Sequence, residues 1–142
     1  MKLTDIKIKK QKPPNFGEII KAFPSVNWER PLAFAYGDTV YHNLEKMTEH
    51  LLIHESTHLH QQEFGKKTKE WWDKYIQDPH FRVSQEIEAY GNQYKFVKAR
   101  TNARGADNFL DQCAHALSGE IYNNAISFAE ARSKIRNHAK ND

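Results

Sequence analysis

Residues 54–58 read His-Glu-Ser-Thr-His, two imidazoles and a carboxylate at a spacing that can hold a metal ion and use it. On a helix, His54 and His58 are four residues apart and stack on one face, as two imidazoles must to reach a single metal. Glu55 lies next to them and could accept a proton. The string therefore predicts a catalytic zinc site, provided that it lies on a helix and that a third ligand exists.

Helical periodicity places His58 and Glu55 toward the protein interior, beside a stripe of apolar residues. A buried carboxylate without a cationic partner is costly, and a zinc ion with its water would supply that partner. We therefore expect His54 and His58 to be metal ligands and Glu55 to be the general base. The nearby His50 and His60 project toward the outer face, and we expect neither to be a ligand.

The third ligand has to come from another segment. The extended motif H-E-x-x-H-x-x-G-x-x-H is not completed, because Gln61 and Phe64 stand at its last two positions. A glutamate on a second helix is the alternative, as in zinc sites built from two His and one Glu. In the segment 84–94, helical projection places Glu86 on the face expected to be buried and Glu88 on the more solvent-exposed face. Glu86 is therefore the third ligand that we predict.

The size and composition indicate a soluble, single-domain protein. The chain has 142 residues, 39% of them hydrophobic, and this length fits one domain. Its one cysteine, Cys113, excludes an internal disulfide and a thiolate zinc cage. No run approaches the ~20 apolar residues of a membrane-spanning helix, and residues 1–14 lack the apolar core of a secretory signal. We expect a cytoplasmic protein without a membrane partner.

The positive charge is concentrated at the N-terminus. The chain has a net charge of +3, but residues 1–12 alone carry +4, which leaves −1 for residues 13–142. The domain itself therefore lacks a basic face, and nucleic acid is not the partner that we expect. We interpret residues 1–14 as a basic segment or a lysine-flanked edge strand, and residues 15–142 as one domain. The oligomeric state does not follow from the sequence.

The order of elements predicts an α+β fold, with a small β-hairpin followed by helices. The hairpin is expected at 32–36 and 39–42, around Gly37-Asp38. Helices are expected at 15–23, from an N-cap at Asn43 to Gly65, at 66–78, at 84–100, at 106–117 and at 120–140. The helix at 66–78 should be broken at Asp78-Pro79. Of the adjacent Trp71 and Trp72, we expect one to anchor the core and the other to lie at the surface.

His54-Glu55-x-x-His58, followed by Glu86-x-x-Ala89, resembles the gluzincin branch of the zincin metallopeptidases. The resemblance covers about residues 32–100 and is closest in size to the minigluzincins. It also extends, more loosely, to small zincin-like proteins encoded by bacteriophages. It implies a zincin-like fold in which a downstream glutamate helix supplies the third zinc ligand, and a location in the host cytoplasm or a virion. Tyr90 departs from the pattern, because many relatives have Asp or Asn after the alanine.

The resemblance implies hydrolysis of peptide bonds in a peptide or protein substrate. Three protein ligands leave a zinc position open for water, and Glu55 would take the proton of that water. Tyr122, His115 and Tyr90 are candidates for stabilising the oxyanion. Two other function classes stay open: a zinc-binding structural or interaction protein, for example in a virion, and a nucleic-acid-associated protein that uses the N-terminal lysines.

Overall fold

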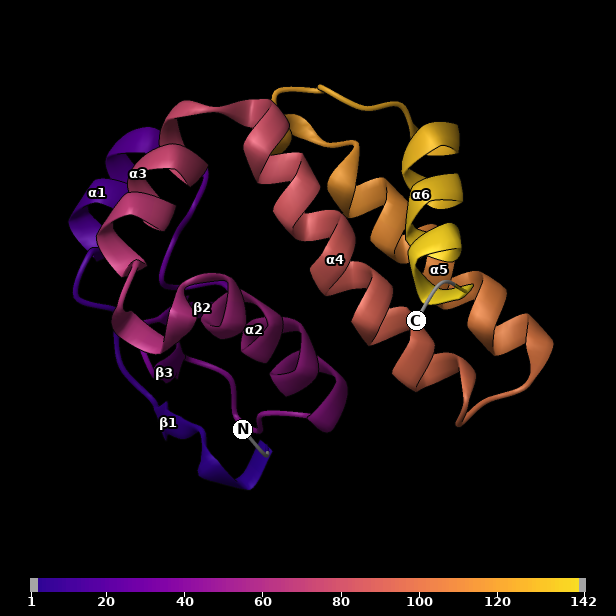
Figure 1. Ribbon diagram of the computed structural model, residues 1–142, viewed down its shortest axis with the longest axis horizontal. Helices are drawn as coiled ribbons and strands as arrows, with labels where there is room; N and C mark the ends of the chain where they lie inside the picture. The colour runs from indigo at the N-terminus through magenta and orange to yellow at the C-terminus, as the bar shows by residue number, and fades with distance from the viewer. Residues whose placement is uncertain (1–2, 141–142) are drawn as a thin grey trace. The chain divides into compact units, whose positions relative to one another are not determined.

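The structure is a computed structural model that describes residues 3–140. It has the predicted α+β character, with several helices and one three-stranded sheet. The chain divides into two compact units, Met1–Gln77 and Asp78–Asp142 (Figure 1). In the part of the chain that is described, no helix combines the length and the apolar character needed to cross a membrane.

The first unit holds the sheet and three helices. Their bounds are β1 Lys7–Lys9, α1 Phe16–Ala22, β2 Ala33–Tyr36, β3 Thr39–His42, α2 Glu49–Gln61 and α3 Thr68–Gln77, with single turns of 3-10 helix at η1 Leu3–Asp5 and η2 Glu63–Gly65. The sheet has the order β1-β3-β2. The predicted hairpin is confirmed, since β2 and β3 are antiparallel around a turn in which Gly37 has a φ of 71°.

Residues 1–14 were interpreted as a basic segment or an edge strand, and the structure contains the edge strand. Strand β1 pairs with β3 in parallel, and all three of its residues are exposed. Lys7 forms an ion pair with Asp38 at 3.0 Å, and this lysine holds the pKa of the Asp38 carboxyl below its usual range. The lysines of β1 are therefore at the solvent side of the sheet rather than part of a separate basic domain.

Helix α2 packs against the sheet and supplies the centre of a small core (Figure 1). Val40 and Leu59 are fully buried there, with Ile6 and Ala35 beside them. Every residue of β3 is buried, as expected for the central strand of three. The core thus fixes the helix that carries two of the predicted metal ligands, His54 and His58, to the most buried part of the sheet.

The prediction that this helix begins after Asn43 is wrong. Helix α2 begins at Glu49, and Thr48 precedes it in extended conformation. The Asn43 side chain closes a loop instead: it accepts a hydrogen bond from the backbone N–H of Leu32 and donates to the carbonyls of Trp28 and Arg30. The helix also ends at Gln61 rather than at Gly65.

The second unit contains three helices that pack pairwise on one another, α4 Pro79–Lys98, α5 Ala103–Leu117 and α6 Phe128–Lys140. The expected break at Asp78-Pro79 is confirmed, since α3 ends at Gln77, and the same two residues start α4. The Asp78 carboxylate accepts hydrogen bonds from the N–H groups of His80 and Phe81, and Pro79 occupies the first turn. The helix predicted at 84–100 therefore begins five residues earlier.

The helix predicted at 120–140 is two elements. A single turn, η3 Glu120–Tyr122, ends at Asn123, which has a φ of 57°, and α6 begins only at Phe128. The buried guanidinium of Arg82 in α4 donates to the carbonyl of Ile121 at 2.7 Å and to Oδ1 of Asn123 at 2.9 Å. This buried cation holds the loop away from the helical path that the sequence suggested.

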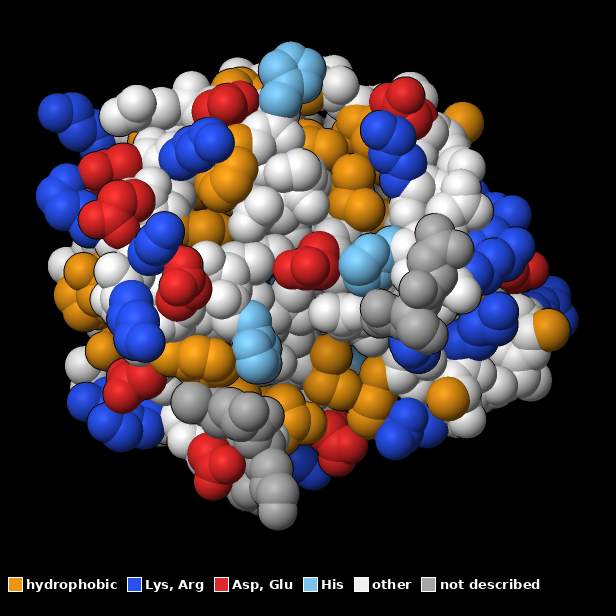
Figure 2. All heavy atoms as spheres, viewed as in Figure 1, with side chains coloured by type: hydrophobic (Ala, Val, Ile, Leu, Met, Phe, Trp, Pro, Cys, Tyr) orange, Lys and Arg blue, Asp and Glu red, His pale blue; other side chains and the backbone are white. Residues whose placement is uncertain are grey.

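Basic and acidic side chains are interspersed on the surface of the first unit. Over α1 and α3, Figure 2 shows Lys and Arg side chains alternating with Asp and Glu. Two ion pairs join residues four positions apart on this unit: Lys69 with Asp73 at 2.7 Å, and Lys67 with Glu63 at 3.6 Å.

Candidate metal centre

The motif His54-Glu55-x-x-His58 lies on α2, in a stretch of six consecutive buried residues, 54–59. His54, Glu55 and His58 expose 7%, 8% and 5% of their surface, so the predicted inward direction is confirmed. Burial extends further around the helix than helical projection suggested, because Ser56 is buried as well. Its hydroxyl donates to the carbonyl of Ile53 at 2.9 Å, which satisfies the polar group without solvent.

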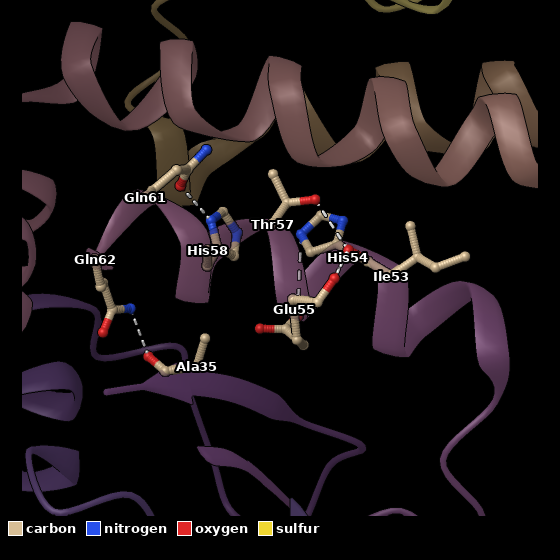
Figure 3. Close-up of polar contacts among 9 residues, drawn as sticks. Ala35, Ile53, His54, Glu55, Thr57, His58, Gln61 and Gln62 are labelled. Carbon is tan, nitrogen blue, oxygen red and sulfur yellow. Dashed lines mark hydrogen bonds and ion pairs between the residues drawn. The ribbon is translucent and has the colours of Figure 1, made fainter. Parts of the chain in front are cut away.

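The two imidazoles lie next to each other along α2, as Figure 3 shows. The ring centroids of His54 and His58 are 5.0 Å apart, and the rings are nearly perpendicular, at 78°. The Glu55 carboxylate oxygen Oε2 lies 4.0 Å from Nε2 of His54. The helix thus presents two nitrogen donors and an adjacent carboxylate, which is the arrangement that the spacing predicted.

His58 is enclosed by aromatic rings and hydrogen-bonded at one ring nitrogen. Its ring centroid lies 5.2 Å from that of Trp71 and 6.4 Å from that of Tyr75. Its Nδ1 lies 2.8 Å from Oε1 of Gln61, the last residue of α2 (Figure 3). Trp71 and Trp72 are both buried, so the prediction that one of them lies at the surface is wrong. Both indole rings pack against the ring of Tyr75 on the same helix, α3.

The end of α2 is tied to the hairpin by Gln62, a residue that the sequence did not single out. Its side chain is fully buried, with Nε2 donating to the carbonyl of Ala35 at 2.9 Å (Figure 3) and Oε1 accepting from the N–H of Gly37 at 2.8 Å. Trp72 donates to the same Ala35 carbonyl at 3.0 Å. In the sequence, the only indication of this contact was that a polar residue, Gln62, directly follows the helix that carries the motif.

The third predicted ligand, Glu86, is a buried residue of α4, whereas Glu88 is exposed. The placement of Glu86 on the buried side and of Glu88 on the exposed side is therefore confirmed, and Ala89 and Gln93 are buried as expected. Within the described residues, His54, His58 and Glu86 are the side chains that could together hold a metal ion.

The two remaining histidines near the motif are outside this group. His60 is exposed, with its ring packed edge-on against Phe64 at 4.6 Å between centroids. His50 is partly buried, and this burial lowers the pKa of its imidazole, with a smaller contribution from His54. That neither is a ligand stays a prediction.

The candidates for stabilising an oxyanion lie on the second unit. Tyr122 is buried at the end of η3, between the two residues that Arg82 binds. His115 is exposed on α5, and its ring lies 4.3 Å from that of Phe128. Tyr90 is partly buried on α4. The roles of all three stay predictions.

Comparisons with known proteins identified no relative. No family model matches the chain, and neither the curated proteins nor the solved structures include a match to it. The function is therefore inferred from the residues themselves.

Proposed function

We propose that this chain is a zinc-dependent metallopeptidase of the gluzincin type, with a zincin-like fold, that hydrolyses peptide bonds in a peptide or protein. His54, His58 and Glu86 are the proposed zinc ligands, and Glu55 is the proposed general base. The observation that carries the proposal is the buried group of these three ligands, with the carboxylate of Glu55 next to one of its imidazoles.

The donor set fits zinc. Two imidazole nitrogens and one carboxylate oxygen are ligands that Zn²⁺ takes in catalytic sites, whereas structural sites fill all four positions with protein ligands, usually including thiolates. The one cysteine, Cys113, is a buried residue of α5, and burial raises the pKa of its thiol to about 12. A zinc ion held by the three ligands would polarise a carbonyl and lower the pKa of a coordinated water to ~7.

Glu55 is suited to move the proton. Its carboxylate would accept a proton from the attacking water and pass it to the nitrogen of the leaving amine as the peptide C–N bond breaks. The burial of Glu55 excludes bulk water, which strengthens its interactions with charges in the site. Tyr122 or His115 would donate a hydrogen bond to the developing oxyanion.

An intact Glu55 favours an enzyme over a purely structural zinc protein, because a structural site needs no base. The test compares Glu55→Gln with Glu49→Gln, an exposed glutamate at the start of the same helix. We expect the unmodified protein to contain stoichiometric zinc by elemental analysis and to cleave members of a peptide library.

Glu55→Gln should keep the zinc and lose cleavage, whereas Glu49→Gln should keep both. Zinc without cleavage in the unmodified protein would instead support a structural or interaction protein with a zincin-like fold, such as a virion component. A protein purified without zinc, and unable to take it up, would overturn the site.

A further inference from the structure

We propose that Gln61 is a positioning residue that selects the tautomer of His58. Its side-chain carbonyl oxygen holds the imidazole proton on Nδ1, which leaves the lone pair of Nε2 for a metal ion. The proposal rests on the proposed function in taking His58 as a zinc ligand. The tautomer itself is a property of the metal-free protein and is tested there.

The first argument is the contact between the two side chains. Oε1 of Gln61 lies 2.8 Å from Nδ1 of His58, and a carbonyl oxygen can only accept a hydrogen bond. A neutral imidazole carries one proton, so a proton on Nδ1 means that Nε2 carries none. The hydrogen bond at one ring nitrogen thus decides which nitrogen can bind a metal.

The second argument is the surroundings of the His58 ring. Only 5% of the residue is exposed, and the rings of Trp71 and Tyr75 lie 5.2 and 6.4 Å away between centroids. Aromatic rings on this side leave the imidazole little room to rotate, and burial keeps water from replacing the Gln61 oxygen. The Gln61 oxygen therefore has a large influence on the proton position.

The third argument is the way the backbone at Gln61 is held. The next residue, Gln62, is fully buried and is bound through its side chain to Ala35 and Gly37. Its backbone N–H donates to the carbonyl of His58 at 3.0 Å. These bonds fix the last turn of α2, so that the side chain of Gln61 starts from a defined position one turn beyond His58. The adjacent glutamines thus have different tasks, since Gln62 anchors the helix and Gln61 orients the ring.

The experiment measures the tautomer directly, without metal or substrate. Long-range ¹H–¹⁵N correlation spectra of the metal-free protein at pH ~8.5, where an ordinary imidazole is neutral, distinguish a protonated Nδ1 from a protonated Nε2. We expect His58 to be protonated on Nδ1. Gln61→Met, which has a similar length but no carbonyl oxygen, should move the proton to Nε2 or give a mixture. Gln61→Glu, which restores an oxygen acceptor, should return it to Nδ1.

Zinc affinity, measured by competition with a chromophoric chelator, is the second readout. Gln61→Met should weaken binding by about 10–100-fold, the usual effect of removing a partner of a ligand histidine, and Gln61→Glu should retain most of the affinity. Circular dichroism and urea unfolding identify variants that fail to fold, and Gln61→Glu then carries the comparison with the unmodified protein.

Two results would overturn the proposal: His58 protonated on Nε2 in the unmodified protein, or a folded Gln61→Met with unchanged tautomer and unchanged zinc affinity. Failure of the proposed function looks different. In that case the unmodified protein takes up no zinc, while His58 still carries its proton on Nδ1 and loses that preference in Gln61→Met.

Discussion

Gln62 donates a hydrogen bond from its side-chain Nε2 to the carbonyl oxygen of Ala35, 2.9 Å away and 27 residues earlier in the chain. The other end of the same amide accepts a hydrogen bond from the N–H of Gly37. One fully buried side chain therefore joins the end of the motif helix to the hairpin at two backbone groups. The amide nitrogen and the amide oxygen of Gln62 each have a backbone partner, so the buried side chain is hydrogen-bonded at both ends.

Replacing Gln62 by Leu should lower the free energy of unfolding by about 2–4 kcal/mol, because the buried N–H of Gly37 loses its acceptor and the Ala35 carbonyl keeps only Trp72. Urea unfolding followed by circular dichroism measures the change. Gln11→Leu is the control, since Gln11 is exposed and its substitution should change stability by about 0.5 kcal/mol or less. Equal effects of the two substitutions would show that the Gln62 contacts contribute nothing.

Glu86 and Glu88 form a matched pair for testing the third ligand, since they lie two residues apart on α4 with opposite exposure. Glu86→Ala should reduce zinc affinity by at least about 100-fold, because a catalytic zinc site holds its ion through three protein ligands. Glu88→Ala should leave the affinity unchanged. Isothermal titration of the metal-free proteins with zinc measures both. The reverse result would make Glu88 the ligand.

Gly91 marks a close approach between α4 and α6. A methyl group at this position would lie 2.3 Å from Cδ2 and 3.0 Å from Cβ of His138, so Gly91→Ala should destabilise the protein by about 1–3 kcal/mol. His138→Ala removes the ring but keeps Cβ, so only the 3.0 Å contact remains in that background. Gly91→Ala should there cost clearly less, because the better helix propensity of alanine, up to about 1 kcal/mol, offsets the remaining contact.

A double-mutant cycle by urea unfolding gives the coupling between the two positions. A clearly smaller cost of Gly91→Ala in the His138→Ala background is the expected outcome. An additive cycle would mean that His138 moves aside without cost.

The Cys113 thiol should be unreactive in the folded protein. Burial raises its pKa to about 12, whereas an exposed thiol has a pKa of about 8.5. At pH ~9 the unfolded chain therefore carries a thiolate and the folded chain a thiol, which predicts labelling by an aromatic disulfide at least about 100-fold slower in buffer than in urea.

The linkage between ionisation and folding gives a direction for stability. Because the folded pKa of Cys113 is the higher one, its contribution is complete below the pKa of the unfolded chain and is lost as the pH rises toward about 12. Cys113→Ala should remove this part of the alkaline loss of stability. Fast labelling in buffer would contradict the burial of the thiol.

The sequence predicted most reliably where local pattern and tertiary burial agree. The hairpin around Gly37 and the opposite faces of Glu86 and Glu88 are cases in which periodicity alone identifies the structure. The errors concern helix starts. Asn43 has the chemistry of an N-cap, but its side-chain amide closes a loop. The break at Asp78-Pro79 was predicted, whereas the role of Asp78 as the cap of the next helix was not.

Gln61 and Gln62 could not be predicted for a related reason. A glutamine has no preferred partner in the local sequence, and its two amide groups find theirs through the tertiary structure. The acceptor of the Gln62 amide is on a strand that precedes it by 27 residues. Such contacts require the packing of α2 on the hairpin to be known first.

The three-stranded sheet has two edges, and each is closed to further strands in a different way. At β2, the outward carbonyl of Ala35 already accepts hydrogen bonds from Gln62 and Trp72. At β1, the exposed lysines Lys7 and Lys9 place charge along the open side. An added strand would have to displace a buried amide at one edge or approach like-charged groups at the other. The small sheet is thereby protected from edge-to-edge aggregation between copies of the protein.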